Sequence, residues 1–89
     1  MVRLFVRHTV ADYAAWRKGY DAFEPQRRPM GVTGHAVYQS VDNPNDVTVW
    51  HDFATAQQAQ SFMASEELKK AMQTAGVQGT PIVWITNAT

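Results

Sequence analysis

The order of strand and helix patterns constrains the fold of this chain more than any other feature. Its 89 residues read as strand, helix, strand, strand, helix, strand, with almost nothing left over. This order predicts one sheet with both helices on the same face. With right-handed crossovers, the strand order is 4-1-3-2 and all neighbours are antiparallel. We therefore expect a single α+β domain of ferredoxin-like βαββαβ type spanning residues 1–89.

The four strands are expected at 2–8, 32–41, 46–53 and from Pro81 onward. Residues 2–8 alternate strictly in character, which is typical of a strand whose two faces have different surroundings. The stretch 42–45 (Asp-Asn-Pro-Asn) has the composition of a tight turn, so the second and third strands should form a hairpin. Pro81 should open the last strand, where proline is tolerated.

The helices are delimited by capping residues. Asp12 can cap the first helix, which we expect to bend at Pro25 and to end at Gly31. Thr55 and Gln58 form a capping box for the second helical region, 55–76. Ser65 can start a new cap, so this region should break near 64–65.

One face of the sheet is left without helices, and the residues assigned to it are apolar. They include Phe5, Trp50 and Trp84, the last within an apolar run at 82–85. A strand that is apolar on both faces is normally covered on both faces. A bare apolar face of this size is unusual on a soluble monomer. We therefore expect a homodimer in which Phe5, Trp50 and Trp84 meet the second copy.

Composition narrows the classes of partner. Eight basic residues balance eight acidic ones, so there is no excess of positive charge for nucleic acid. The chain has no cysteine, which excludes disulfides and thiolate chemistry and fits a reducing compartment. The first residues have arginines within a short apolar run, unlike a signal peptide or a membrane span. We expect a cytoplasmic protein that binds neither nucleic acid nor membranes.

Two stretches of the sequence resemble a known family. The segment from His8 to Arg17 fits the pattern H-x-V-x-D-Y-x-x-W, which is frequent at the start of small bacterial dimeric α/β-barrel proteins. The segments 47–53 and 55–72 are similar to their third strand and second helix. These proteins are related to the antibiotic-biosynthesis monooxygenases, and the resemblance covers nearly the whole chain.

The resemblance implies two sheets packed face to face in a dimer, with a ligand cavity between sheet and helices in each subunit. Some relatives in the superfamily are haem-degrading oxygenases with an axial histidine on the second helix. Residues 55–75 of this chain contain no histidine and have Phe62 and Met63 in the comparable region. We therefore expect no haem and no other cofactor.

Three histidines could transfer protons near neutral pH: His8, His35 and His51. His51 shares its strand face with Val47 and Val49, which should point at the helices. A polar group there requires a hydrogen-bond partner or a cavity. Two of three hairpin registers place His35 on the same face as His51. We take His51, or His35, as a candidate catalytic base.

The histidines do not form a convincing metal site. His8 should lie on the order of 10 Å or more from His51, because the two sit at opposite ends of neighbouring strands. Asp52 points away from His51, so no carboxylate completes a set of ligands. We expect no metal ion.

The first helix carries an aromatic stripe at helical spacing. Its side chains can be ordinary core, or they can wall a pocket whose ligand satisfies the tyrosine hydroxyls. The candidate pocket residues are Tyr13, Trp16, Tyr20 and Phe62. Their expected partner is a small aromatic or apolar molecule.

Several functions remain open. One is a cofactor-independent monooxygenase or cyclase acting on an aromatic or polyketide-like compound, with a lactone-type isomerase as a close variant. The other is a non-catalytic ligand-binding or stress-related dimeric module. The fold hosts enzymes and binding proteins alike, so the sequence does not decide whether the protein is an enzyme.

Overall fold

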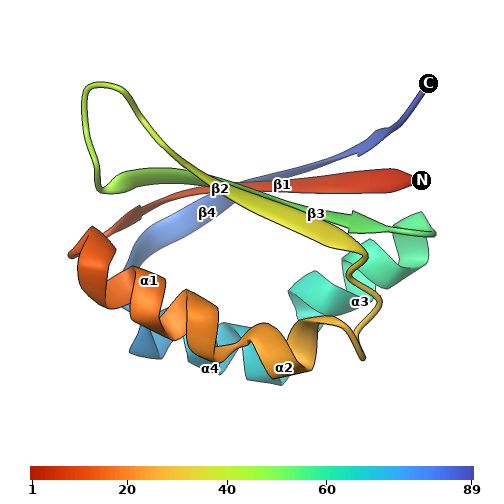
Figure 1. Ribbon diagram of the computed structural model, residues 1–89, viewed down its shortest axis with the longest axis horizontal. Coiled ribbons are helices and arrows are strands. Elements are labelled where there is room, and N and C mark those ends of the chain that lie inside the picture. The colour runs from red at the N-terminus through yellow and green to blue at the C-terminus, as the bar shows by residue number, and fades with distance from the viewer.

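A computed structural model describes all residues, 1–89, as a four-stranded sheet with helices on one side (Figure 1). The sheet order is β2-β3-β1-β4 with antiparallel neighbours, which confirms the predicted topology. The elements in chain order are β1 (Val2–Val10), α1 (Tyr13–Ala22), α2 (Glu24–Arg27), β2 (Gly34–Gln39), β3 (Asp46–Phe53), α3 (Ala56–Ala64), α4 (Glu66–Thr74) and β4 (Val77–Asn87).

The first helical region breaks earlier than predicted. Asp12 caps α1 as expected, because its carboxylate accepts a hydrogen bond from Ala15 N at 2.9 Å. The helix ends at Ala22, and Phe23 separates it from the single turn of α2, which has Pro25 near its start. Proline lacks a backbone N–H and disfavours a helical residue before it, so the interruption spreads upstream of Pro25.

The second helical region follows the predicted caps. Thr55 Oγ1 accepts from Gln58 N at 3.2 Å, and Gln58 Oε1 accepts from Thr55 N at 3.3 Å. Ser65 Oγ accepts from Leu68 N at 3.1 Å and starts α4. The predicted break at 64–65 is therefore confirmed.

Strand β4 begins at Val77, so the expectation that Pro81 opens it was wrong. Gln78 pairs with Thr9 and Ile82 pairs with Arg7, so three residues of β4 lie opposite His8 alone. Pro81 is one of these three unmatched residues. Its missing N–H therefore breaks no regular hydrogen bond between β4 and β1. β4 is also an edge strand, which tolerates such an irregularity.

The core lies between the sheet and the helices. Alternate residues of β1, including Leu4 and Val6, point toward the helices together with Phe53 of β3 and Phe62 of α3. A second cluster continues the core toward the start of α1, around Trp16. None of the helices combines the length and apolar character that crossing a membrane requires.

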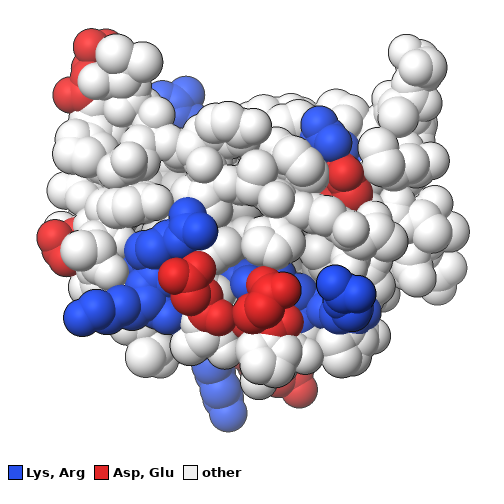
Figure 2. All heavy atoms as spheres, viewed as in Figure 1, with Lys and Arg blue, Asp and Glu red and all other residues white.

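The other face of the sheet carries the residues assigned to the dimer contact. The rings of Phe5 and Trp84 stack with centroids 5.0 Å apart, and Trp84 is 41% exposed. The Arg3 guanidinium lies 3.7 Å from the Trp50 ring centre and forms a two-point ion pair with Asp52, at 2.7 and 3.0 Å. Figure 2 shows charged side chains crowded over α1 and α2 and few along the sheet.

Candidate functional site

The sheet and the helices enclose a mainly apolar cavity next to the core. Its volume is about 60 Å³, room for a few water molecules or a small fragment. Strands β1 and β3 form its floor, and residues of all four helices form its walls. The lining side chains are Val6, His8, Trp16, Gly19, Tyr20, Phe23, Arg27, Val49, His51, Phe62, Met63, Leu68, Ala71, Met72 and Ala75.

His51 is the polar group on the cavity floor. The alternation of side chains along β3 points it at the helices. Its ring lies between those of Phe62 and Tyr20, with centroid distances of 5.0 and 6.2 Å. It is 5% exposed, and neither ring nitrogen has a hydrogen-bond partner. Such a group is costly to bury, so it marks a place where a polar ligand atom would be stabilising.

The protonation of His51 is set by its surroundings. Burial, then the charge of Arg27 and that of His35, lower the pKa of His51 to about 3. The ring is therefore neutral at pH 7, with one N–H donor and one acceptor nitrogen. A group with so low a pKa is a weak base. His51 is therefore better suited to orienting a ligand than to removing a proton from it.

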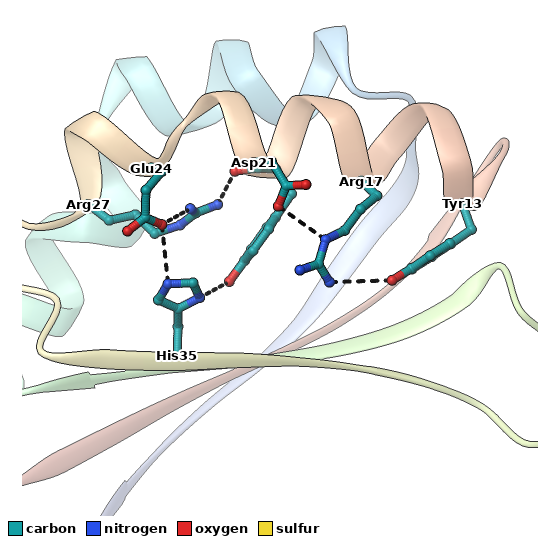
Figure 3. Close-up of polar contacts among 7 residues, drawn as sticks. Tyr13, Arg17, Asp21, Glu24, Arg27 and His35 are labelled. Atoms are coloured by element: carbon teal, nitrogen blue, oxygen red, sulfur yellow. Dashed lines mark hydrogen bonds and ion pairs between the residues drawn. The ribbon is translucent and has the colours of Figure 1, made fainter.

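His35 lies beside His51, as one of the predicted registers required. The two residues are directly paired across β2 and β3, and their rings lie 5.9 Å apart at an angle of 21°. The Nδ1 of His35 is 2.6 Å from the Tyr20 hydroxyl, and the Nε2 of His35 is 3.2 Å from Glu24 Oε2 (Figure 3). The carboxylate favours the tautomer with the proton on Nε2, in which Nδ1 accepts the Tyr20 O–H.

Arg27 closes this side of the cavity. Its guanidinium lies 3.7 Å from the Tyr20 ring centre and donates to Glu24 at 2.9 Å and to the Tyr20 carbonyl. Figure 3 shows Glu24 and Arg27 on the helical side and His35 rising from β2, with dashed lines joining Glu24 to both Arg27 and His35. Burial raises the pKa of Tyr20 to about 12, so its hydroxyl stays protonated.

His8 lies apart from the other two histidines. It pairs with Val47, whereas His51 pairs with Leu4, which comes four residues before His8 in β1, so the two histidines are about 13 Å apart along the strand. Its ring packs edge-on against Trp16 at 5.5 Å, its Nδ1 lacks a partner, and burial lowers its pKa. No group of three or more potential metal-binding side chains is brought together.

Three of the four candidate pocket residues line the cavity: Trp16, Tyr20 and Phe62. Tyr13 does not line it. Its ring packs on Trp16 at 5.8 Å, and its hydroxyl accepts from Arg17 at 3.4 Å on the outer side of α1.

Sequence reasoning missed Arg27 as a site residue. The signal was present, because the spacing of the aromatic stripe continues from Phe23 to Arg27. An arginine at a stripe position must bury its charge among apolar side chains or pair it. Gly19 was also missed: a Cβ there would lie 2.9 Å from Ala75 Cβ, so glycine permits the close approach of α1 to the end of α4.

The fold has close counterparts among solved structures. A candidate antibiotic biosynthesis monooxygenase from Bordetella bronchiseptica superposes with a TM-score of 0.85 at 17% identity, covering 99% of this chain and 96% of that one. SnoaB, a cofactor-independent oxygenase from Streptomyces nogalater, gives 0.80 at 14% identity, covering 99% and 92%. This chain therefore has the same fold as these two proteins.

A third counterpart, Rv0793 from Mycobacterium tuberculosis, gives a TM-score of 0.74 at 15% identity, covering 99% of this chain and 94% of that one. These identities establish a shared fold and nothing about activity. No family model and no curated protein matches the sequence.

Proposed function

We propose that this protein binds a small aromatic or polyketide-like molecule in the cavity and oxidises it without a cofactor. The observation that carries the proposal is His51, a buried histidine with both ring nitrogens unpartnered on the floor of an otherwise apolar cavity. A ligand hydroxyl or carbonyl would satisfy this ring, and the apolar walls would hold the rest of the molecule.

The proton acceptor in this proposal is His35. Glu24 holds its Nε2–H, so Nδ1 can take the Tyr20 hydroxyl proton while the Tyr20 oxygen takes one from the ligand. The pKa of about 12 makes a free tyrosinate costly, so the two transfers have to occur together. His51 then acts as a ligand-orienting residue, and His35 as the base.

The reaction balances without an added reductant. A ligand with an acidic methylene group next to an aromatic ketone loses a proton, and the resulting carbanion reduces molecular oxygen. One oxygen atom becomes the new carbonyl group and the other leaves as water, which takes up both methylene hydrogens. The ligand itself supplies the electrons.

The cavity is too small for a ligand of several rings, so the wall formed by α3 and α4 has to move outward when such a ligand binds. Typical ligand pockets enclose roughly 300–1,000 Å³, against about 60 Å³ here. This wall is formed by Met63, Leu68 and Met72, and no residue of α4 is buried. Methionine side chains adapt readily, so the wall can widen at modest cost.

A non-catalytic binding protein is the second candidate. The unpartnered ring nitrogens of His51 support it, because a ligand would satisfy them whether or not a reaction follows.

The two candidates are separated by following oxygen uptake with a tricyclic phenolic ketone that carries an acidic methylene group. The enzyme should consume one molecule of oxygen for each new carbonyl formed, and His35→Gln should lower the rate at least about tenfold while ligand binding persists. If the ligand binds but oxygen uptake does not exceed the spontaneous rate, the protein is a non-catalytic binding protein. If the ligand does not bind, both proposals are rejected.

We further propose that the protein is a homodimer joined through the open face of the sheet. Support comes from the exposed Trp84 and Ile82 on an edge strand beside Phe5. Burying this apolar surface against a second copy would stabilise both.

A further inference from the structure

The cavity has an unbalanced charge. Arg27 is the only permanently charged side chain among its 15 lining residues, and none of them is a carboxylate. Its counterion Glu24 lies outside the lining and is 57% exposed, so solvent screens part of the negative charge. An anionic group inside the cavity would therefore be attracted to Arg27.

Arg27 has a donor left over for such a group. Its side chain is 3% exposed, and its two terminal nitrogens are occupied by Glu24 and the Tyr20 carbonyl. The Nε–H is buried and has no partner. A guanidinium held this way offers a fixed, charge-assisted donor.

His51 offers a second donor on the same cavity surface. Its exposed fraction is only 5%, and both of its ring nitrogens are unpartnered. Both side chains line the same cavity and lie next to Tyr20: the Arg27 guanidinium lies 3.7 Å from the Tyr20 ring centre, and the His51 ring centre lies 6.2 Å from it.

We propose that the molecule bound in the cavity carries an anionic oxygen, which receives hydrogen bonds from Arg27 Nε–H and from the N–H of His51. This inference rests on the proposed function and narrows its ligand class to an acidic head on an apolar body. The head is a carboxylate, or a phenol or enol bound as its oxyanion. The apolar body lies against Phe62, Met63 and Met72.

The test compares ligands of one shape and different charge. Isobutyrate and isobutyramide, both small, are titrated into the whole protein and followed by the NMR signals of the His51 ring. We expect isobutyrate to bind at least about tenfold more tightly and to shift the His51 signals. A phenolate source is tested separately with 4-nitrophenol, whose yellow absorbance should increase on binding.

Two variants assign the effect to Arg27. Arg27→Met should abolish the preference for isobutyrate over isobutyramide. Since that change removes buried hydrogen bonds, Glu24→Gln provides a second test at an exposed position. It leaves Arg27 less neutralised and should strengthen isobutyrate binding severalfold relative to isobutyramide.

The outcomes separate this inference from the proposed function. If both anions bind no more tightly than isobutyramide, the proposal of an anionic ligand is rejected, and a cavity for neutral ligands remains supported. Binding of none of the three probes would overturn both. Preference for the carboxylate alone, or for the phenolate alone, would support the inference and identify the head.

Discussion

At the scale of single residues, the unpartnered imidazole of His51 is the feature with the clearest energetic consequence. A buried polar atom without a partner costs about 1–3 kcal/mol, and both His51 ring nitrogens lack one. A residue that lowers stability in this way is typical of a functional site.

Replacing His51 should therefore stabilise the protein. His51→Phe fills the same space between Tyr20 and Phe62 with an apolar ring, and we expect the free energy of unfolding to rise by about 1–2 kcal/mol. His35→Phe is the matched control, because it breaks the bond to the Tyr20 hydroxyl and should destabilise. Urea denaturation measures both; a destabilised His51→Phe protein would show that the ring is satisfied.

The pH dependence of stability should follow from the same residue. Its pKa is about 3 in the folded protein against 6.5 when unfolded, so the unfolded state binds the extra proton between these values. Stability present above pH 6.5 is then lost as the pH falls toward 3. Between pH 7 and pH 5 we expect a loss of about 2 kcal/mol.

His51→Phe should remove that part of the loss, while His8, whose pKa burial also lowers, keeps a smaller dependence in the same direction. Denaturation curves of both proteins at pH 7 and pH 5 provide the comparison. Parallel losses in wild type and variant would contradict the lowered pKa.

Residue-level prediction from sequence succeeded where alternation alone decides which face a side chain occupies. His51 and Asp52 point to opposite faces of β3 as expected: His51 lines the cavity, and Asp52 pairs with Arg3 on the open face. The spacing of the stripe indicates that Arg27 follows Phe23 on one helix face, but whether its guanidinium reaches a cavity depends on how the chain turns after Phe23. The helical spacing past a proline does not determine this turn.

At the scale of elements, capping residues predicted the boundaries of helices best and prolines predicted boundaries worst. Thr55 and Ser65 begin helices where the sequence indicates, because their side chains satisfy N–H groups within three residues. Pro25 and Pro81 mark interruptions whose extent depends on the neighbouring strand or helix. The break at Phe23 and the irregular pairing before Ile82 were therefore not visible in the sequence.

Removing the first of these caps should weaken the protein measurably. Thr55→Ala deletes the side-chain acceptor of the capping box, and we expect a loss of about 1 kcal/mol in the free energy of unfolding. Ser61→Ala, in the exposed middle of the same helix, is the control and should change stability by less than about 0.5 kcal/mol. Equal effects at the two sites would show that the cap contributes nothing.

At the scale of the whole molecule, the asymmetry of the sheet dominates. One face is covered by helices, while the other exposes Trp84 and Ile82 next to Phe5. The charges are concentrated on the helical side (Figure 2). The helical side is thus densely charged, whereas the open face of the sheet has an apolar patch beside the ion pairs Arg3–Asp52 and Arg7–Asp46.

A charge on the apolar patch should disrupt the proposed homodimer. Trp84→Asp would bury an unpaired carboxylate at the proposed contact, so we expect a monomer or an insoluble protein. Ala14→Asp, on the exposed surface of α1, should leave the dimer intact. Sedimentation velocity measures the mass of both; a fully folded, dimeric Trp84→Asp protein would place the contact elsewhere.

The most direct test of the proposed site uses the four methionines as reporters. Met63 and Met72 line the cavity, whereas Met1 and Met30 do not. With labelled methionine methyl groups, titration of a tricyclic phenolic ketone should shift the NMR signals of Met63 and Met72 and leave the other two unchanged. Shifts confined to Met1 and Met30, or no shift at saturating ligand, would contradict a binding site between the sheet and the helices.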